Sequence, residues 1–162
     1  MTPRDEGLRW LGQARRDLDD ARYLQEGERW SLTCFHAQQA AERALKGLLI
    51  LRGAEDPWGH SVADLAQLAV SLDERWRSWR VDVTGLDLYY IPTRYPDALP
   101  GGLPADAFTG DDAERALGKA QGVLDAVARA FDEDASPIDL PAQESMFELH
   151  ADEQQVPREE SD

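Results

Sequence analysis

One stretch of the chain, residues 30–52, most constrains how the protein can fold. Its apolar residues recur every three or four positions, which is the spacing of one face of an α-helix. That face starts with small side chains and ends with large ones: Ala37, Ala41, Ala44, Leu48 and Leu51. Small side chains let a neighbouring helix approach closely, and Gly53 is a typical residue just past a helix end. The stretch therefore predicts a long helix packed closely against a neighbour.

Helical spacing continues through the rest of the first 131 residues. We expect four further helices, over residues 5–25, 62–72, 76–90 and 109–131. Pro92 is expected to stop the fourth, because proline cannot continue the hydrogen bonding of a helix. No segment combines alternating polarity with β-branched residues, so we expect no sheet. The sequence predicts an all-α protein, an up-and-down bundle of four to five helices.

Charge divides the chain into two parts. Residues 132–162 hold 11 acidic residues and one arginine, whereas residues 1–131 hold 21 acidic and 16 basic residues. The acidic part also has three prolines and no helical period. We therefore expect a helical bundle over 1–131 and a disordered acidic tail over 132–162. The formal net charge of -15 argues against broad, non-specific binding of nucleic acid, which needs many phosphate contacts, but it leaves room for a local basic pocket.

Several function classes find no support in the sequence. A single cysteine, Cys34, cannot form an internal disulfide and gives no cluster for a metal site. There is no glycine-rich phosphate loop, no paired-histidine metal motif and no nucleophile-elbow sequence around a serine. The N-terminus lacks the pattern of a signal peptide, and the longest apolar run is too short to span a bilayer. We expect a cytoplasmic protein with no membrane partner, no metal and no cofactor.

Three polar residues of the alanine-rich helix, Gln39, Glu42 and Lys46, share one stripe. Glu42 and Lys46 also have the i,i+4 spacing of a helical ion pair. The stripe is either an ordinary solvated surface or a polar patch that meets another element or a phosphate. His60 precedes Ser61, the expected cap of the next helix, where it could assist anion binding or pack as a lid bonded to the backbone.

The segment "YYIPTRYPD", residues 89–97, holds one arginine among tyrosines and prolines. It leads into a proline- and glycine-rich loop over 92–108, which we expect to be non-helical. Loops of this length in a compact domain often carry function. Arg94 is either a structural arginine that ties the loop to a carboxylate such as Glu42, or the cation of a phosphate or base site. In the second case Tyr90 or Tyr95 would stack beside it.

Three runs of residues occur in order along the chain: "FHAQQAAERALKGLLILRG", "HSVADL" and "RYPD". Followed by a last alanine-rich helix, they resemble the HEPN domain family, the higher eukaryotes and prokaryotes nucleotide-binding domain. The resemblance runs from about Leu8 to Phe131. It implies a bundle of four or five helices that is commonly paired as a homodimer. Many family members accompany a minimal nucleotidyltransferase, and some are toxin ribonucleases that cleave RNA without a metal.

In those ribonucleases an arginine precedes a histidine by a spacing of four to six residues, near the start of a late helix. Here the last helix has Arg115 and Arg129 but no histidine. Arg29 and His36 have a matching spacing but lie at the start of the second helix. With 15 arginines and three histidines, about one such match is expected by accident. We therefore lean against an enzyme and keep Arg29 and His36 as the only catalytic candidates.

The resulting interpretation is a HEPN-like protein that binds a nucleotide or a nucleic-acid segment. It would be a non-catalytic companion of a minimal nucleotidyltransferase. Lys46 and Arg94 would hold phosphate charge, His60 would donate a hydrogen bond, and a tyrosine, Tyr95 or Tyr90, would stack on a base.

Gln39 and Glu42 would orient Lys46 or Arg94. A homodimer is expected because the alanine-rich face and five tryptophans give more apolar surface than a short bundle can bury. Two alternatives remain open. One is a metal-independent endoribonuclease of a toxin–antitoxin pair, and the other is a purely structural protein-interaction module.

Overall fold

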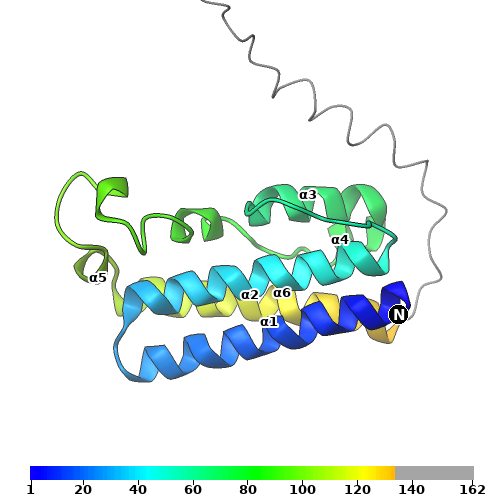
Figure 1. Cartoon of the computed structure of the whole chain (residues 1–162), viewed down its shortest axis with the longest axis horizontal. Helices are drawn as coiled ribbons and strands as arrows, with labels where there is room; N and C mark the ends of the chain where they lie inside the picture. The colour runs from blue at the N-terminus through cyan, green and yellow to red at the C-terminus, as the bar shows by residue number, and fades with distance from the viewer. Residues whose placement is uncertain (134–162) are drawn as a thin grey trace, which may run out of the picture.

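The computed structural model describes residues 1–133, and that part of the chain is built from helices and loops without a strand. The long helices α1 (Pro3–Glu26), α2 (Trp30–Leu51) and α6 (Gly110–Asp132) lie side by side along the molecule (Figure 1). The predicted all-α bundle is confirmed. The predicted disordered tail lies, from residue 134, outside the described residues. Within residues 1–133, no helix combines the length and the apolar character needed to cross a bilayer.

Helix α2 is the central helix of the bundle. From Ala37 to Leu51 every residue except Arg43 is buried, because α1 and α6 pack on one part of its surface and α3 (Val62–Leu72) on another. Helix α2 lies close against α1 at Gly47, where an added Cβ would lie 2.8 Å from the carbonyl oxygen of Gly7. The alanines of the predicted face, Ala37, Ala41 and Ala44, are fully buried, and the contact between the two backbones is at Gly47, which the predicted face did not include.

Two helix starts follow their predicted capping residues. The hydroxyl of Ser61 accepts a hydrogen bond from the amide of Asp64 at the start of α3. Thr109 and Asp112 form a reciprocal capping box at the start of α6. Each side chain satisfies an amide that has no partner inside its helix.

The predicted fourth helix over 76–90 is wrong. Helix α4 (Glu74–Ser78) has five residues, and the chain then turns at Arg80, whose φ is 50°. Gly85, at φ 83°, precedes a short 3₁₀ helix, η1 (Leu86–Tyr89). Between them the amide of Thr84 bonds to the Asp82 carboxylate, a local turn that competes with helical bonding. The β-branched residues here and the glycine disfavour a helix more than the apolar spacing favours one.

The loop predicted over 92–108 is present but contains two single turns of helix. These are the 3₁₀ helix η2 (Pro96–Ala98) and the short α5 (Pro104–Ala107), each begun by a proline at its first position. Proline is favoured there because its fixed φ suits a first turn. The segment from η1 to α5 lies along the same side of α2 as α3, toward the other end of the molecule (Figure 1).

Candidate functional site

The carboxylate of Glu42 is the centre of a buried polar cluster on α2. Its Oε1 accepts a hydrogen bond from Lys46 Nζ at 3.0 Å and lies 3.2 Å from His60 Nδ1. Its Oε2 accepts from Gln39 Nε2 at 3.1 Å and from Gln38 Nε2 at 3.3 Å. Glu42 and Lys46 are only 4% and 7% exposed. The alternative of an ordinary solvated stripe is therefore wrong.

Burial of this ion pair is compensated by its hydrogen bonds. A charge taken out of water is costly unless it is paired and its remaining positions are bonded. Glu42 meets that condition, and Gln38 further bonds to the backbone oxygen of His60 at 3.0 Å. Gln38 was missed by the sequence analysis, although its position four residues before Glu42 is the spacing that brings helical side chains together. The positive charge of Lys46 is thus already matched by Glu42.

The ring of His60 connects this cluster to the loop. It stacks on the ring of Tyr90 with centroids 4.6 Å apart and 19° between the planes. The His60 side chain is 57% exposed, whereas the Glu42 carboxylate that it touches is buried. One face of the site is therefore anchored inside the protein, and the other is open to solvent.

The guanidinium of Arg94 lies among aromatic rings. Its central carbon is 4.1 Å from the ring centroid of Phe35, 4.9 Å from that of Tyr90 and 5.1 Å from that of Tyr95. Its Nε and Nη2 both donate to the backbone oxygen of Tyr90, at 2.9 and 2.7 Å. The sequence predicts the tyrosine neighbours, and Phe35 is an addition that only the approach of α2 to the loop reveals.

Arg94 is not tied to Glu42. Among residues 1–133 it forms no ion pair, and its Nη1 forms no hydrogen bond. Its contacts within the protein are ring faces and one carbonyl group, which fix its direction without neutralising its charge. The structure thus brings His60, Tyr90, Arg94 and Tyr95 into one row, which we call the Arg94 surface.

Neither of the two catalytic candidates belongs to the Arg94 surface, although His36 contacts the Phe35 ring on which Arg94 packs. Arg29 is exposed at the N-cap of α2, and its side chain makes no capping bond. His36 is half-buried, with its ring edge-on to Phe35 at 5.2 Å. Helical geometry sets the two residues about 10 Å apart along the axis. In the described part of the chain no hydrogen bond or ion pair joins them, and no group of three or more potential ligand side chains could hold a metal.

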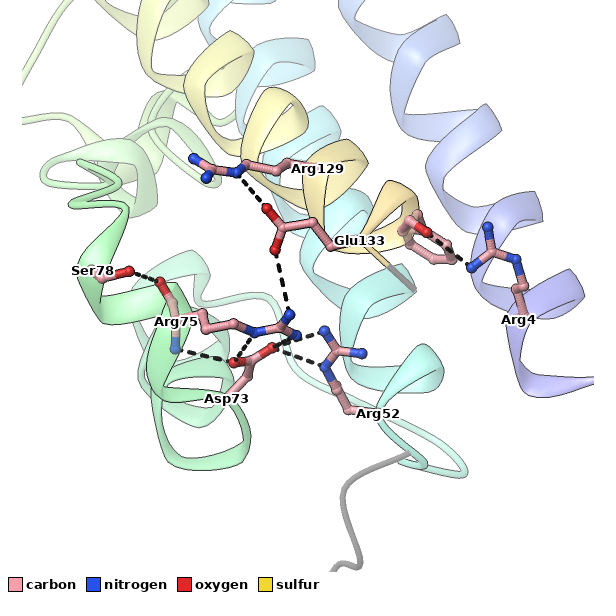
Figure 2. Close-up of polar contacts among 8 residues, drawn as sticks. Arg4, Arg52, Asp73, Arg75, Ser78, Arg129 and Glu133 are labelled. Carbon is pink, nitrogen blue, oxygen red and sulfur yellow. Dashed lines mark hydrogen bonds and ion pairs between the residues drawn. The ribbon is translucent and has the colours of Figure 1, made fainter. Parts of the chain in front are cut away.

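A second charged cluster lies at the opposite end of α2 (Figure 2). Arg52 Nη2 and Arg75 Nη2 donate to the same Asp73 oxygen, at 2.8 and 2.7 Å. Arg75 Nη1 also lies 3.4 Å from Glu133 Oε2, and Glu133 accepts from Arg129 at 2.8 Å. Hydrogen bonds from Arg75, with those from Arg52, lower the pKa of Asp73 from 3.8 to about 2. Every charge of this cluster has an opposite partner.

The lone cysteine has no nucleophilic role in this arrangement. Cys34 is fully buried in the core. Burial raises the pKa of its thiol to about 12, and a thiol that stays protonated is a poor nucleophile.

Comparisons with known proteins identify the family of this chain. The model of the HEPN domain matches residues 8–130. A Methanocaldococcus jannaschii protein named "Putative toxin MJ1304" is 26% identical over 73% of this chain and 83% of its own length. The crystal structure of TT1696 from Thermus thermophilus is 43% identical, with a TM-score of 0.65, over 76% of this chain and 97% of that one.

The crystal structure of ST0689, described as an archaeal HEPN homologue, is 34% identical with a TM-score of 0.60. That similarity covers 78% of this chain and 98% of the homologue. A matching family model over most of the chain, together with two solved structures above 30% identity, makes the assignment. The chain belongs to the HEPN domain family.

Proposed function

We propose that this HEPN-family protein binds a nucleotide or a nucleic-acid segment at the Arg94 surface. The observation that carries the proposal is Arg94 itself, a cation held among three rings without a carboxylate partner in residues 1–133. Guanidinium groups bind phosphate through charge-assisted hydrogen bonds. In a chain with a net charge of -15, one cation kept uncompensated is a candidate for an anionic ligand.

The rings beside Arg94 favour a ligand that carries bases as well as phosphate. Tyr95 is 48% exposed, and the His60 side chain is 57% exposed. Exposed aromatic and imidazole rings are the surfaces on which unpaired bases stack. The proposal therefore gives Arg94 the phosphate, gives Tyr95 or His60 the base, and gives Tyr90 the task of holding both in place.

Lys46 and Glu42 take supporting roles in this proposal. Because Lys46 is bonded to Glu42 and buried, a phosphate would have to displace that bond to reach it. The Glu42 carboxylate in turn fixes the His60 ring. Gln38 and Gln39 hold the carboxylate from the other side.

The proposal extends to partners by family likeness alone. We propose a homodimer that acts as the non-catalytic companion of a minimal nucleotidyltransferase, as the sequence resemblance implies. Sedimentation of the purified protein tests the dimer, since a monomer at high micromolar concentration would contradict it. Co-purification with a nucleotidyltransferase encoded beside it tests the partner.

Ligand binding is tested directly with a labelled oligonucleotide. A fluorescein-labelled single-stranded RNA of about ten nucleotides, a length within the usual range of such sites, is titrated with the full chain at low salt. Arg94→Gln should weaken binding about tenfold or more, because a hydrogen bond to a charged group contributes about 1.5–3 kcal/mol. Fluorescence anisotropy measures the effect.

The matched control is Arg9→Gln on α1. Arg9 is an exposed arginine paired with Glu6, so its replacement removes the same charge at a distant place. It should leave the affinity within about twofold, the scale of long-range screened effects. Equal affinities for Arg94→Gln and Arg9→Gln would contradict the proposal.

One observation favours a second candidate function. The relative named "Putative toxin MJ1304" is compatible with the endoribonuclease alternative, in which Arg29 and His36 would act. Incubation of the protein with RNA, beside His36→Ala, separates the two. Cleavage that disappears in His36→Ala would replace the binding-only proposal.

A further inference from the structure

A pocket of about 410 Å³ lies between helix α6 and the segment that follows α4. Residues of that segment, such as Trp79 and Arg80, form one wall, and Lys119, Gly122 and Arg129 of α6 form the other. The residues of the Arg94 surface and the Glu42 cluster do not line it. The pocket is therefore a separate feature from the proposed binding site.

The wall on α6 leaves room for a peptide chain. Gly118 and Gly122 are one turn apart, and a Cβ added to either would meet nothing within 4 Å. The opposite wall carries the half-buried ring of Trp79, over which the Arg129 guanidinium lies at 5.1 Å. A half-buried ring and two glycines in the lining of one pocket suit an extended segment with some apolar side chains.

Charge makes an acidic occupant the best fit. Five charged side chains line the pocket: Arg80, Lys119, Arg129, Asp82 and Asp125. Lys119 lies 3.6 Å from Asp82, but the exposed guanidinium of Arg80 has no hydrogen bond or ion pair within residues 1–133. Residues 1–133 carry 23 acidic and 16 basic side chains. Because Lys119 lies near Asp82 and Arg129 is bonded to Glu133, the cation of the pocket wall that an acidic segment can pair with is Arg80.

We propose that residues 134–149 of the same chain occupy this pocket. The described chain ends at Glu133, whose carboxylate bonds to Arg129 in the pocket wall and lies 3.4 Å from Arg75 (Figure 2). The proposed occupant therefore begins where the pocket begins. The segment "DASPIDLPAQESMFEL" has four carboxylates, no lysine or arginine, and five large apolar side chains.

The segment is long enough to lie along the whole pocket. Lys119 is fourteen residues before Glu133 on α6, which is about 21 Å at the rise of an α-helix. About seven extended residues span that distance. A tethered segment also has an effective concentration in the millimolar range, so a few contacts suffice to hold it.

The pocket is nearer to this segment than the Arg94 surface is. Arg94 packs on Phe35 near the start of α2, whereas Glu133 lies beside the cluster that includes Arg52 at the end of α2. The two places are about 25 Å apart along that helix. The tail can therefore dock here while the Arg94 surface stays open.

Lysine chemistry gives a sharp test in the full-length protein. The chain has two lysines, Lys46 and Lys119, and Lys46 is buried and bonded to Glu42. A carbodiimide joins an amine to a carboxylate that already touches it. After treatment and tryptic digestion, mass spectrometry should find Lys119 joined to a carboxylate within 134–149, with fragmentation locating the residue.

Three comparisons make the outcome decisive. Arg80→Gln should lower the yield of that cross-link several-fold, whereas Arg16→Gln, an exposed arginine of α1, should leave it unchanged. A link from Lys119 to Asp82 reports that the reagent reached the lysine.

If Lys119 links only to Asp82 or Asp125, the proposal is overturned. In a mixture of ¹⁴N- and ¹⁵N-labelled protein, links between differently labelled chains would assign the pocket to a second copy and overturn it as well.

Discussion

Two arginines near the two ends of α2 are held in opposite ways. Arg52, 1% exposed, donates through Nε and Nη2 to the carboxylate of Asp73. Arg94 donates through the same two nitrogens, but its acceptor is the backbone oxygen of Tyr90. Rings rather than carboxylates surround its remaining surface.

This difference separates a structural charge from a charge available to a ligand. Arg52 and Arg75 share the carboxylate of Asp73, so the cluster around them fastens α2 to the α3–α4 junction and, through Arg75, to the end of α6. Arg94 is also held by two hydrogen bonds, but its positive charge has no carboxylate partner within residues 1–133. A fixed, uncompensated cation needs no rearrangement to meet a phosphate, which lowers the cost of binding.

The largest expected effect on the free energy of unfolding is at the end of α2 where Asp73 pairs with Arg52. Asp73→Asn should destabilise the protein by about 3 kcal/mol, because it removes the negative charge to which the buried Arg52 donates two hydrogen bonds. Asparagine can still cap α4, so the loss reports the charge rather than the cap. Urea unfolding measures it, and Asp20→Asn, at the exposed pair with Arg16, should cost about 0.3 kcal/mol or less. Similar losses in the two variants would remove the distinction between the clusters.

Acid should weaken the same cluster selectively. The pKa of Asp73 is about 2 in the folded protein and 3.8 for the unperturbed carboxyl, because Arg75 and Arg52 bond to the ionised form. A lowered pKa stabilises the fold above the unfolded value, and that contribution is lost as pH falls toward about 2. In total it amounts to about 2 kcal/mol.

Comparing the wild type with Asp73→Asn isolates the contribution of the ionised Asp73 carboxylate to the free energy of unfolding. Between about pH 5 and about pH 3 the stability deficit of the variant should shrink by about 1 kcal/mol, since part of the Asp73 titration falls in that window. A deficit independent of pH would show that Asp73 acts without its charge.

A smaller stability effect than that of Asp73→Asn is expected at Arg94. Arg94→Gln should cost about 1 kcal/mol or less, because it removes stacking on partly exposed rings and bonds to one carbonyl group. Urea unfolding of the two variants compares the loss of unfolding free energy in Arg94→Gln with the loss in Asp73→Asn. A loss as large as that of Asp73→Asn would make Arg94 a structural residue and favour the purely structural alternative.

Much of the fold follows from apolar spacing and capping residues. Helices α1, α2, α3 and α6 lie where the sequence predicts them, because long periodic segments carry many consistent signals. The segment after Trp76 has the same apolar spacing, but its turn is decided by Asp82, Thr84 and Gly85, which act locally. Short-range turn chemistry there outweighs the helical period.

The candidate site was predictable only in part. The spacing of Glu42 and Lys46 gives their ion pair, and the sequence "RYPD" singles out Arg94. That the pair is buried depends on how Trp10 of α1 and His60 pack on α2, and that Phe35 rather than Glu42 meets Arg94 depends on how the loop packs across α2. Packing between segments more than 50 residues apart is a tertiary property that neither local sequence contains.

The most direct test of the central claim is an NMR titration of arginine side chains. The Nε–H groups of Arg52 and Arg94 both donate hydrogen bonds in the free protein, to Asp73 and to Tyr90, and a bonded Nε–H exchanges slowly enough to observe. A single-stranded RNA of about ten nucleotides is added to the full chain. The Arg94 signal should shift with saturation while the Arg52 signal stays in place. Binding that leaves the Arg94 signal unmoved would contradict the account.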